Sequence, residues 1–130
     1  MAVGILLVTH EGIGSAMKHV AERLLTPPPL RIECFEVPFD ADLATVLPLA
    51  SAALRRADGG DGVLVLTDLY GASPANVASR LAQLGTPVRR VSALNLPMLL
   101  RVLNYGDLAL SDLPGIAVAG GRNGVQVDDV

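Results

Sequence analysis

The sequence of 130 residues contains few aromatic residues, no tryptophan and a single cysteine. Aromatic residues make up 3% of the chain and hydrophobic residues 51%, so the core has to be built from Val, Leu, Ile and Ala. This composition is typical of a parallel sheet that is covered by helices on both faces. The lone Cys34 excludes an intramolecular disulfide, and we interpret it as a small apolar residue within a strand.

Charge and long apolar runs are also scarce. Charged residues make up 18% of the chain, the formal net charge is −3, and no basic stripe is present, which argues against nucleic acid as a partner. The longest apolar runs have only strand length, so we expect no direct membrane insertion. The first residues, MAVGILLVTHEG, lack the basic region of a signal peptide. We therefore expect a cytoplasmic protein that folds as a single domain over residues 1–130.

Strand-like and helix-like stretches alternate along the chain. The predicted strands cover residues 3–9, 31–37, 63–67 and 88–93, and the predicted helices cover 14–25, 42–57, the stretch from Ser73, and 96–103. Strands joined by helical crossovers form a parallel, doubly wound sheet. We therefore predict a single-domain α/β fold with a mostly parallel sheet of about four strands. The sequence GVQV at 124–127 is predicted to add a short C-terminal strand.

Proline and serine residues indicate where several elements begin or break. Pro48 is expected to kink the second helix or to mark its true first turn. Ser73 is expected to cap the third helix, with Pro74 at the first helical position. Residues 108–120 fit a helix or a strand, and a Pro-Gly pair interrupts either one.

Polar side chains follow the first and third predicted strands, which end at Thr9-His10 and Thr67-Asp68. In an open α/β sheet, ligands bind at the carboxyl ends of the strands, where the strand order reverses. If the two strands are neighbours, His10 and Asp68 face each other. A carboxylate beside an imidazole fixes the tautomer, leaves the other ring nitrogen free as a nucleophile and stabilises the cation that forms.

The segment after Asp68, LYGASPANVASRL, is typical of an anion-binding helix start. The N–H groups of Gly71, Ala72 and Ser73 and of the first turn are expected to point at the crevice, where the positive end of the helix dipole lies. A histidine nucleophile, an orienting carboxylate and a backbone cradle together point to a phosphohistidine carrier. In the competing interpretation, His10 is a packed or solvated residue and Asp68 only forms a turn. His19 lies on a polar helix face, where we expect solvation.

Four stretches, ILLVTHEGIGSAM, VLVLTDLYGASPANVASRL, VSALNLPMLLRVL and GRNGV, carry a resemblance that runs nearly end to end. With them the chain resembles the mannose-type IIA domain of the bacterial phosphoenolpyruvate-dependent sugar phosphotransferase system. The most specific part is a D-x-x-G-x-S-P helix start followed by an N-x-P-M-L segment. The resemblance implies that His10 is the phosphorylated histidine and Asp68 its hydrogen-bond partner.

Further site residues follow from the same resemblance. The phosphate-binding residues that it implies are Gly71, Ala72 and Ser73. Residues expected to flank the pocket are Thr9, at the end of the first strand, and Asn95 and Pro97 in the N-x-P-M-L segment. No metal and no cofactor is expected.

The resemblance also implies the partners. It makes the chain a phosphotransferase that takes the phosphoryl group from phospho-HPr and passes it to a IIB component for sugar uptake, or that regulates through its phosphorylation state. The family forms homodimers in which the last strand crosses to the partner's sheet, a role that residues 124–127 fit. Which sugar is served, if any, stays open. Glu11 departs from the family, which often has glycine there, and it adds a negative charge beside the anion site.

Three other classes of protein fit the sequence less well. A receiver-type signalling domain would need paired acidic residues at the end of the first strand, which Thr9-His10-Glu11 does not supply. A subunit of a dihydroxyacetone kinase would share the fold and the histidine, but the GASP and NLPML segments favour the sugar system. A non-catalytic nucleotide-binding or interaction module lacks support, because no G-x-G-x-x-G or Walker-type loop is present.

Overall fold

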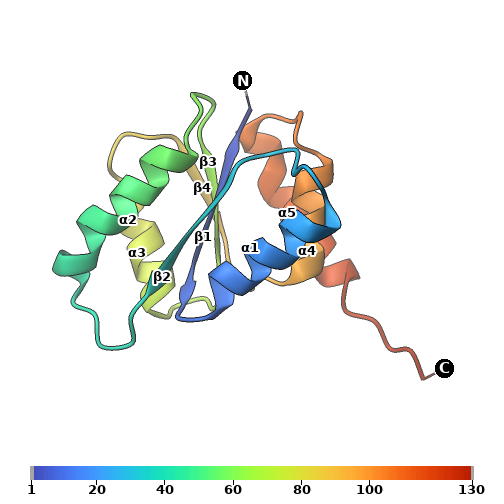
Figure 1. Cartoon of the computed structure of the whole chain (residues 1–130), viewed down its shortest axis with the longest axis horizontal. Helices are drawn as coiled ribbons and strands as arrows, with labels where there is room; N and C mark the ends of the chain where they lie inside the picture. Colours follow the sequence, from blue (N-terminus) through green and yellow to red (C-terminus); the bar gives the residue numbers. More distant parts are fainter. Residues whose placement is uncertain (1, 130) are drawn as a thin grey trace.

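The computed structural model describes residues 2–129 of the chain, which alternate between strands and helices (Figure 1). In chain order the elements are β1 (Gly4–His10), α1 (Ile13–Leu24), β2 (Ile32–Val37), α2 (Leu43–Ala57), β3 (Val63–Thr67), α3 (Ser73–Leu81), β4 (Val88–Val91), α4 (Leu96–Asn104), the 3-10 turn η1 (Leu110–Asp112) and α5 (Leu113–Asn123). Within the described residues the strands form one parallel sheet in the order β2-β1-β3-β4. The predicted α/β class and its four parallel strands are confirmed.

The two central strands, β1 and β3, are the continuous apolar runs of the sequence, and both are almost entirely buried. They pair in parallel, with Val8 opposite Thr67. From β1 the chain passes to β2 on one side and then returns to β3 on the other side. The strand order therefore reverses between β1 and β3, and their carboxyl ends form the crevice where such sheets bind ligands.

Helices cover both faces of the sheet, and each face has its own hydrophobic core (Figure 1). On one face Ile5 and Leu7 pack with α1, α4 and α5, while on the other face Leu6 and Val8 pack with α2 and α3. Successive residues of a strand point to opposite faces, which explains why a strand buried on both sides reads as an unbroken apolar run. Strand β2 is an edge strand, as its alternating sequence predicts.

The structure excludes one of the two alternatives predicted for Pro48, while the kink stays a prediction, and it corrects the prediction for Pro114. Helix α2 begins at Leu43 and continues through Pro48, so this proline does not mark the first turn. Both Pro48 and Ala44, whose carbonyl loses its partner there, are exposed, so water can replace the missing hydrogen bond. The Pro-Gly pair at 114–115 lies in the first turn of α5 rather than interrupting a helix, because a proline needs no intrahelical N–H partner at that position.

Three further details differ from the prediction: the cap of α3, the end of β4 and the C-terminal segment. Helix α3 is capped by Ala72 without a side-chain hydrogen bond, so Ser73 is its first residue rather than its cap. Strand β4 stops at Val91 because Ala93 adopts a left-handed conformation, with φ of 67°, which turns the chain out of the sheet. Within the described chain, residues 124–127 form no strand. The N–H groups of Gly124 and Val125 bond back into α5, and the chain then extends away from the body (Figure 1).

Candidate active site

His10 and Asp68 lie side by side at the carboxyl ends of β1 and β3, as the sequence predicts. The Oδ2 atom of Asp68 lies 2.7 Å from Nδ1 of His10 and accepts the backbone N–H of His10 at 2.9 Å. The side chain of Asp68 is 9% exposed and that of His10 is 26% exposed. The contact at Nδ1 favours the tautomer that carries the proton there, so Nε2 keeps its lone pair.

The second carboxylate oxygen of Asp68 differs from the first. Within residues 2–129, Oδ1 is buried and has no hydrogen-bond partner. Donors to a carboxylate spread and weaken its negative charge, and here all donation comes from His10. The negative charge of Asp68 therefore lies next to the imidazole of His10, where it would stabilise a cationic ring.

Thr9 lies below the site rather than at its surface. Its side chain is fully buried, and Oγ1 donates to the carbonyl of His10 at 2.8 Å and accepts the N–H of Gly14 at 2.9 Å. A Cβ at Gly14 would approach Oγ1 to 3.0 Å, so a glycine suits this position. Thr9 closes the turn between β1 and α1 and thereby holds the backbone of His10.

The loop after Asp68 presents free N–H groups at the start of α3. Gly71 has a φ of 83°, which favours glycine, and within the described chain the N–H groups of Gly71, Ser73 and Ala75 have no acceptor. The N–H of Ala72 is instead bonded to the carbonyl of Leu69 at 3.3 Å. Of the N–H groups expected to form the cradle, those of Gly71 and Ser73 and that of Ala75 in the first turn are therefore free, and the binding of phosphate by Gly71, Ala72 and Ser73 stays a prediction.

The N-terminus of α1 also begins close to His10 in the sequence, but a carboxylate of the protein occupies it. Oε2 of Glu36 accepts the N–H of Ser15 at 2.8 Å and its hydroxyl at 2.7 Å. The backbone hydrogen bond from Ser15 is the largest cause that lowers the pKa of Glu36, followed by the bond from the Ser15 hydroxyl. Because Glu36 already meets the positive end of α1, the N-terminus of α3 is the one left open to an external anion.

The sequence alone does not predict that two residues, Phe39 and Glu11, meet beside His10. The ring centroids of His10 and Phe39 lie 5.4 Å apart with an angle of 31° between the ring planes. Oε1 of Glu11 accepts the backbone N–H of Phe39 at 3.0 Å. The sequence marks Glu11 as a departure from the family, whereas its only signal for Phe39 is that phenylalanine occurs just twice in the chain.

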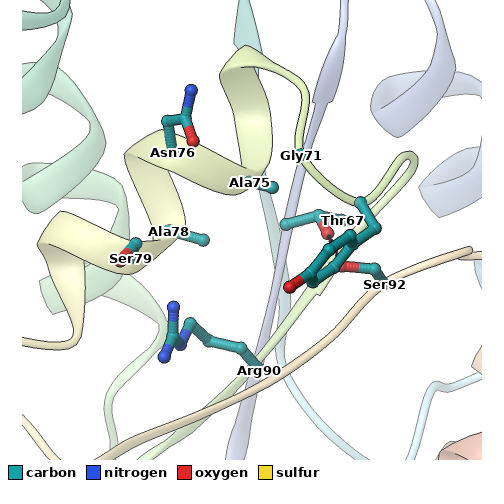
Figure 2. Close-up of a pocket in the computed structure, with 9 residues that line it drawn as sticks. Thr67, Gly71, Ala75, Asn76, Ala78, Ser79, Arg90 and Ser92 are labelled. Atoms are coloured by element: carbon teal, nitrogen blue, oxygen red, sulfur yellow. Dashed lines mark hydrogen bonds between the residues drawn. The ribbon is translucent and has the colours of Figure 1, made fainter.

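A cleft of about 460 Å³ opens beside the cradle, between α3 and β4 (Figure 2). Its lining includes Thr67, Gly71 and Ala75 from the loop and α3 side, and Arg90 and Ser92 from the β4 side. The hydroxyls of Thr67 and Ser92 lie 2.8 Å apart at its floor. Arg90 extends from β4 toward α3, which brings a cation near this edge of the sheet that sequence reasoning did not place there.

Asn95 and Pro97 lie at the start of α4 and contact the C-terminal end of α5. Asn95 caps α4 by accepting the N–H of Met98 at 2.9 Å, and its Nδ2 donates to the carbonyl of Gly121 at 3.1 Å. Gly124 packs so tightly on Pro97 that a Cβ there would overlap the proline ring. Within residues 2–129 neither residue hydrogen-bonds to His10 or Asp68, and their role beside the pocket stays a prediction.

Neither a metal centre nor a membrane span is found in the part of the chain that the structure describes. Between residues 2 and 129 no three or more His, Cys, Asp and Glu side chains gather as metal ligands. Over the same residues no helix has the length and apolar character needed to cross a membrane.

The sheet and its site place the chain among small parallel α/β proteins in which free N–H groups at a helix N-terminus and a histidine–carboxylate pair lie at the carboxyl ends of the central strands. Comparison with known protein families shows to which family within that class the chain belongs. Residues 4–112 match the EIIA-man family, described as "PTS system fructose IIA component", where PTS denotes the phosphotransferase system, and the chain belongs to this family. The resemblance drawn from the sequence motifs is confirmed.

Individual relatives agree with this assignment. The PTS system mannose-specific EIIAB component of Escherichia coli K12 is 29% identical over 128 residues, which is 97% of this chain and 39% of that protein. The chain thus spans about two fifths of the length of the curated relatives it matches. The mannose/sorbose-specific IIA subunit from Enterococcus faecalis has the same fold, with a TM-score of 0.86, 21% identity and coverage of 100% of this chain and 97% of that one.

A second solved structure is closer in sequence. The PTS IIA protein associated with the fucose utilization operon from Streptococcus pneumoniae is 27% identical, with a TM-score of 0.78 and coverage of 98% of this chain and 96% of that chain. The match runs over nearly the full length of both chains. The order of strands and helices described above therefore corresponds to the fold of that protein over almost all of both chains.

Proposed function

We propose that this protein is a phosphohistidine carrier of the sugar phosphotransferase system, in which Nε2 of His10 accepts a phosphoryl group from phospho-HPr. The observation that carries the proposal is the 2.7 Å contact between Nδ1 of His10 and Oδ2 of Asp68. It leaves one ring nitrogen bonded to a carboxylate and the other available as a nucleophile. Membership of the EIIA-man family supports the same reading.

In the proposed step, the Nε2 lone pair of His10 attacks the phosphorus of the phosphoryl group on the donor. The bond between phosphorus and the donor's nitrogen breaks, and its electron pair stays with the donor. The proton on Nδ1 of His10 stays in place, so the ring gains a positive charge as the new bond forms. Asp68 lies against that proton and stabilises the charge, which is the role of a carboxylate paired with a reacting imidazole.

The open N-terminus of α3 is the proposed seat of the phosphoryl oxygens. The free N–H groups of Gly71, Ser73 and Ala75 supply donors, and the helix dipole supplies about half a positive charge. No lysine or arginine is needed for this cradle. Main-chain donors bind the phosphoryl group less tightly than an ionic clamp would, which suits a group that is passed on to the next protein, a IIB component.

Several features support a homodimer in which residues 124–127 pair with β4 of the partner. Within the described chain β4 is an edge strand with an unpaired side, and exposed edges favour pairing with another chain. Clefts lie on both faces of this strand, one of about 460 Å³ and one of about 760 Å³, and Arg90 and Ser92 line both.

The sequence of the C-terminal segment fits that edge. Val125 and Val127 alternate with polar residues and are 77% and 72% exposed in the single chain. The acidic pair at 128–129 complements the exposed basic pair at 89–90 on β4. A strand from a second copy would bury both valines and would bring opposite charges together.

Labelling tests the carrier function directly. The protein is incubated with phosphoenolpyruvate, enzyme I and HPr, and the product is examined for an acid-labile, base-stable phosphate. We expect label on the wild type and on His19→Ala, the matched control with the other histidine removed, and none on His10→Ala. Label that persists in His10→Ala, or a base-labile acyl phosphate, would contradict the proposal. Adding a purified IIB component then tests whether the label is passed on.

A further inference from the structure

The turn after β1 and the loop after β2 meet over His10. His10 is the register partner of Val37, the last residue of β2, so the loop that follows leaves the sheet directly beside the histidine. Phe39 lies two residues into this loop, and its ring reaches the imidazole at a centroid distance of 5.4 Å. Two segments that are far apart in the sequence thus converge on one side chain.

Phe39 contributes little to the hydrophobic core. Its side chain is 72% exposed, and among the described residues its one aromatic neighbour is the ring of His10. The loop is nevertheless held in place at two points. The N–H of Ala41 bonds to the carbonyl of Pro38 at 3.1 Å, and the carboxylate of Glu11 accepts the N–H of Phe39 at 3.0 Å. An exposed phenylalanine in an ordered loop, placed against a reactive side chain, calls for an explanation other than burial.

We propose that Phe39 is a positioning residue for His10 and that Glu11 is the latch that holds it there. This inference rests on the proposed function and concerns the residues that assist it. The ring of Phe39 lies against the imidazole, with 5.4 Å between the centroids, while Asp68 holds Nδ1, and Nε2 is the ring nitrogen left for a phosphoryl donor. The latch also explains Glu11, whose negative charge otherwise fits poorly beside an anion site.

The chemistry of the ring gives Phe39 a second effect. When Nε2 takes the phosphoryl group and Nδ1 keeps its proton, the imidazole becomes cationic. An aromatic ring within about 6 Å of a cation attracts it through its quadrupole, and the attraction grows as water is excluded. Phe39 therefore stabilises the phosphorylated ring more than the neutral ring, and it limits the access of water to the side of the phosphohistidine that it contacts.

The latch predicts a pattern among variants that a purely structural loop would not produce. Phe39→Ala removes the ring that lies against His10, and Glu11→Ala removes the hydrogen bond that holds this ring in place. Both changes therefore act through the contact between Phe39 and His10. We expect each single variant to lower kcat/KM for phosphoryl acceptance about fivefold through kcat, the size of a lost aromatic–cation contact. The double variant should be no worse than Phe39→Ala, because coupled residues are not additive. Glu11→Gln, which keeps an oxygen acceptor, should restore most of the rate lost in Glu11→Ala.

The experiment measures phosphorylation kinetics with phospho-HPr and, separately, the hydrolysis rate of the isolated phosphoprotein. We expect Phe39→Ala and Glu11→Ala to hydrolyse several-fold faster than the wild type. Tyr105→Ala is the matched control, since it removes another partly exposed aromatic ring, 41% exposed, at the end of α4. It should leave both rates unchanged.

Three outcomes would overturn the proposal. The first is a wild-type kcat and hydrolysis rate in Phe39→Ala. The second is an effect on KM alone with unchanged hydrolysis, which would make Phe39 a docking residue for the donor. The third is additivity of the two single changes. Label in His10→Ala would instead overturn the proposed function itself, so the two failures are distinguishable.

Discussion

His10 contacts Asp68 twice through the same oxygen: Oδ2 lies 2.9 Å from the backbone nitrogen of His10 and 2.7 Å from Nδ1 of its ring. The backbone contact ties the carboxylate to the end of β1, and the ring contact orients the imidazole. Because one atom makes both contacts, the position of the ring is set relative to the sheet rather than to a flexible loop.

Asp68→Asn should slow phosphoryl acceptance about 10- to 100-fold while leaving the fold intact. The amide oxygen can still accept the backbone N–H of His10, but the charge that stabilises a cationic ring is lost, a difference of about 1.5–3 kcal/mol for a hydrogen bond to a charged group. Initial rates of labelling from phospho-HPr measure the effect, and thermal unfolding checks the fold. Asp68→Ala should be slowed as well. A wild-type rate in either variant would remove Asp68 from the mechanism.

Gly71→Ala should weaken the cradle through its backbone. Gly71 has a φ of 83°, and a Cβ there would meet nothing within 4 Å, so the cost is conformational strain rather than a clash. We expect a loss of about 1 kcal/mol in the free energy of unfolding. We also expect a lower extent of phosphorylation, since the loop relaxes and its N–H groups turn away. Urea unfolding and labelling measure the two effects.

Gly85→Ala provides the matched control for that change. Gly85 has a φ of 101° and equally open space, but it lies in the turn after α3, away from the site. The control should lose similar stability and keep normal phosphorylation. Equal loss of phosphorylation in both variants would show that instability, and not the cradle, explains Gly71→Ala.

Glu36→Gln should remove a pH-dependent part of the stability. Hydrogen bonds from Ser15 hold the pKa of Glu36 below its ordinary value of 4.5 in the folded state. A carboxyl whose pKa is lower when folded stabilises the fold at pH values above 4.5, and this contribution is lost as the pH falls toward the folded pKa. The wild type should therefore be the more stable protein at pH 7, and its advantage over Glu36→Gln should shrink below about pH 4.5. Thermal unfolding across this range measures the difference, and a gap that stays constant would contradict the assignment.

The central sheet and the histidine–carboxylate pair were predictable because both follow from local patterns. Unbroken apolar runs identify β1 and β3 as strands buried on both faces, and neighbouring parallel strands bring their carboxyl ends together. His10 and Asp68 each come at the end of such a run, so their proximity needs only that the strands be adjacent. The adjacency of β1 and β3 is the one piece of long-range geometry in that inference.

Other features depend on contacts that no local pattern carries. Phe39 reaches His10 because a loop turns back over the sheet, and its neighbours in the sequence do not encode that turn. The N–H of Ala72 donates to the carbonyl of Leu69 and is not free, and this bond follows only from the conformation of the loop. The alternation in residues 124–127 predicts a strand, but a strand also needs an edge to pair with, and in the single chain Gly124 and Val125 instead bond to the end of α5.

The C-terminal segment gives the prediction that tests the assembly. The double change of Val125 and Val127 to Asp should convert the proposed dimer to a monomer, because strand exchange would then bury two carboxylates in place of two apolar side chains. Sedimentation velocity measures the change. Leu49→Asp is the control, since this residue is 60% exposed on α2 and its charge would not reach β4. A wild type that sediments as a monomer would contradict the dimer, whereas a dimer that survives the double change would mean that the copies associate through another surface than the edge of β4.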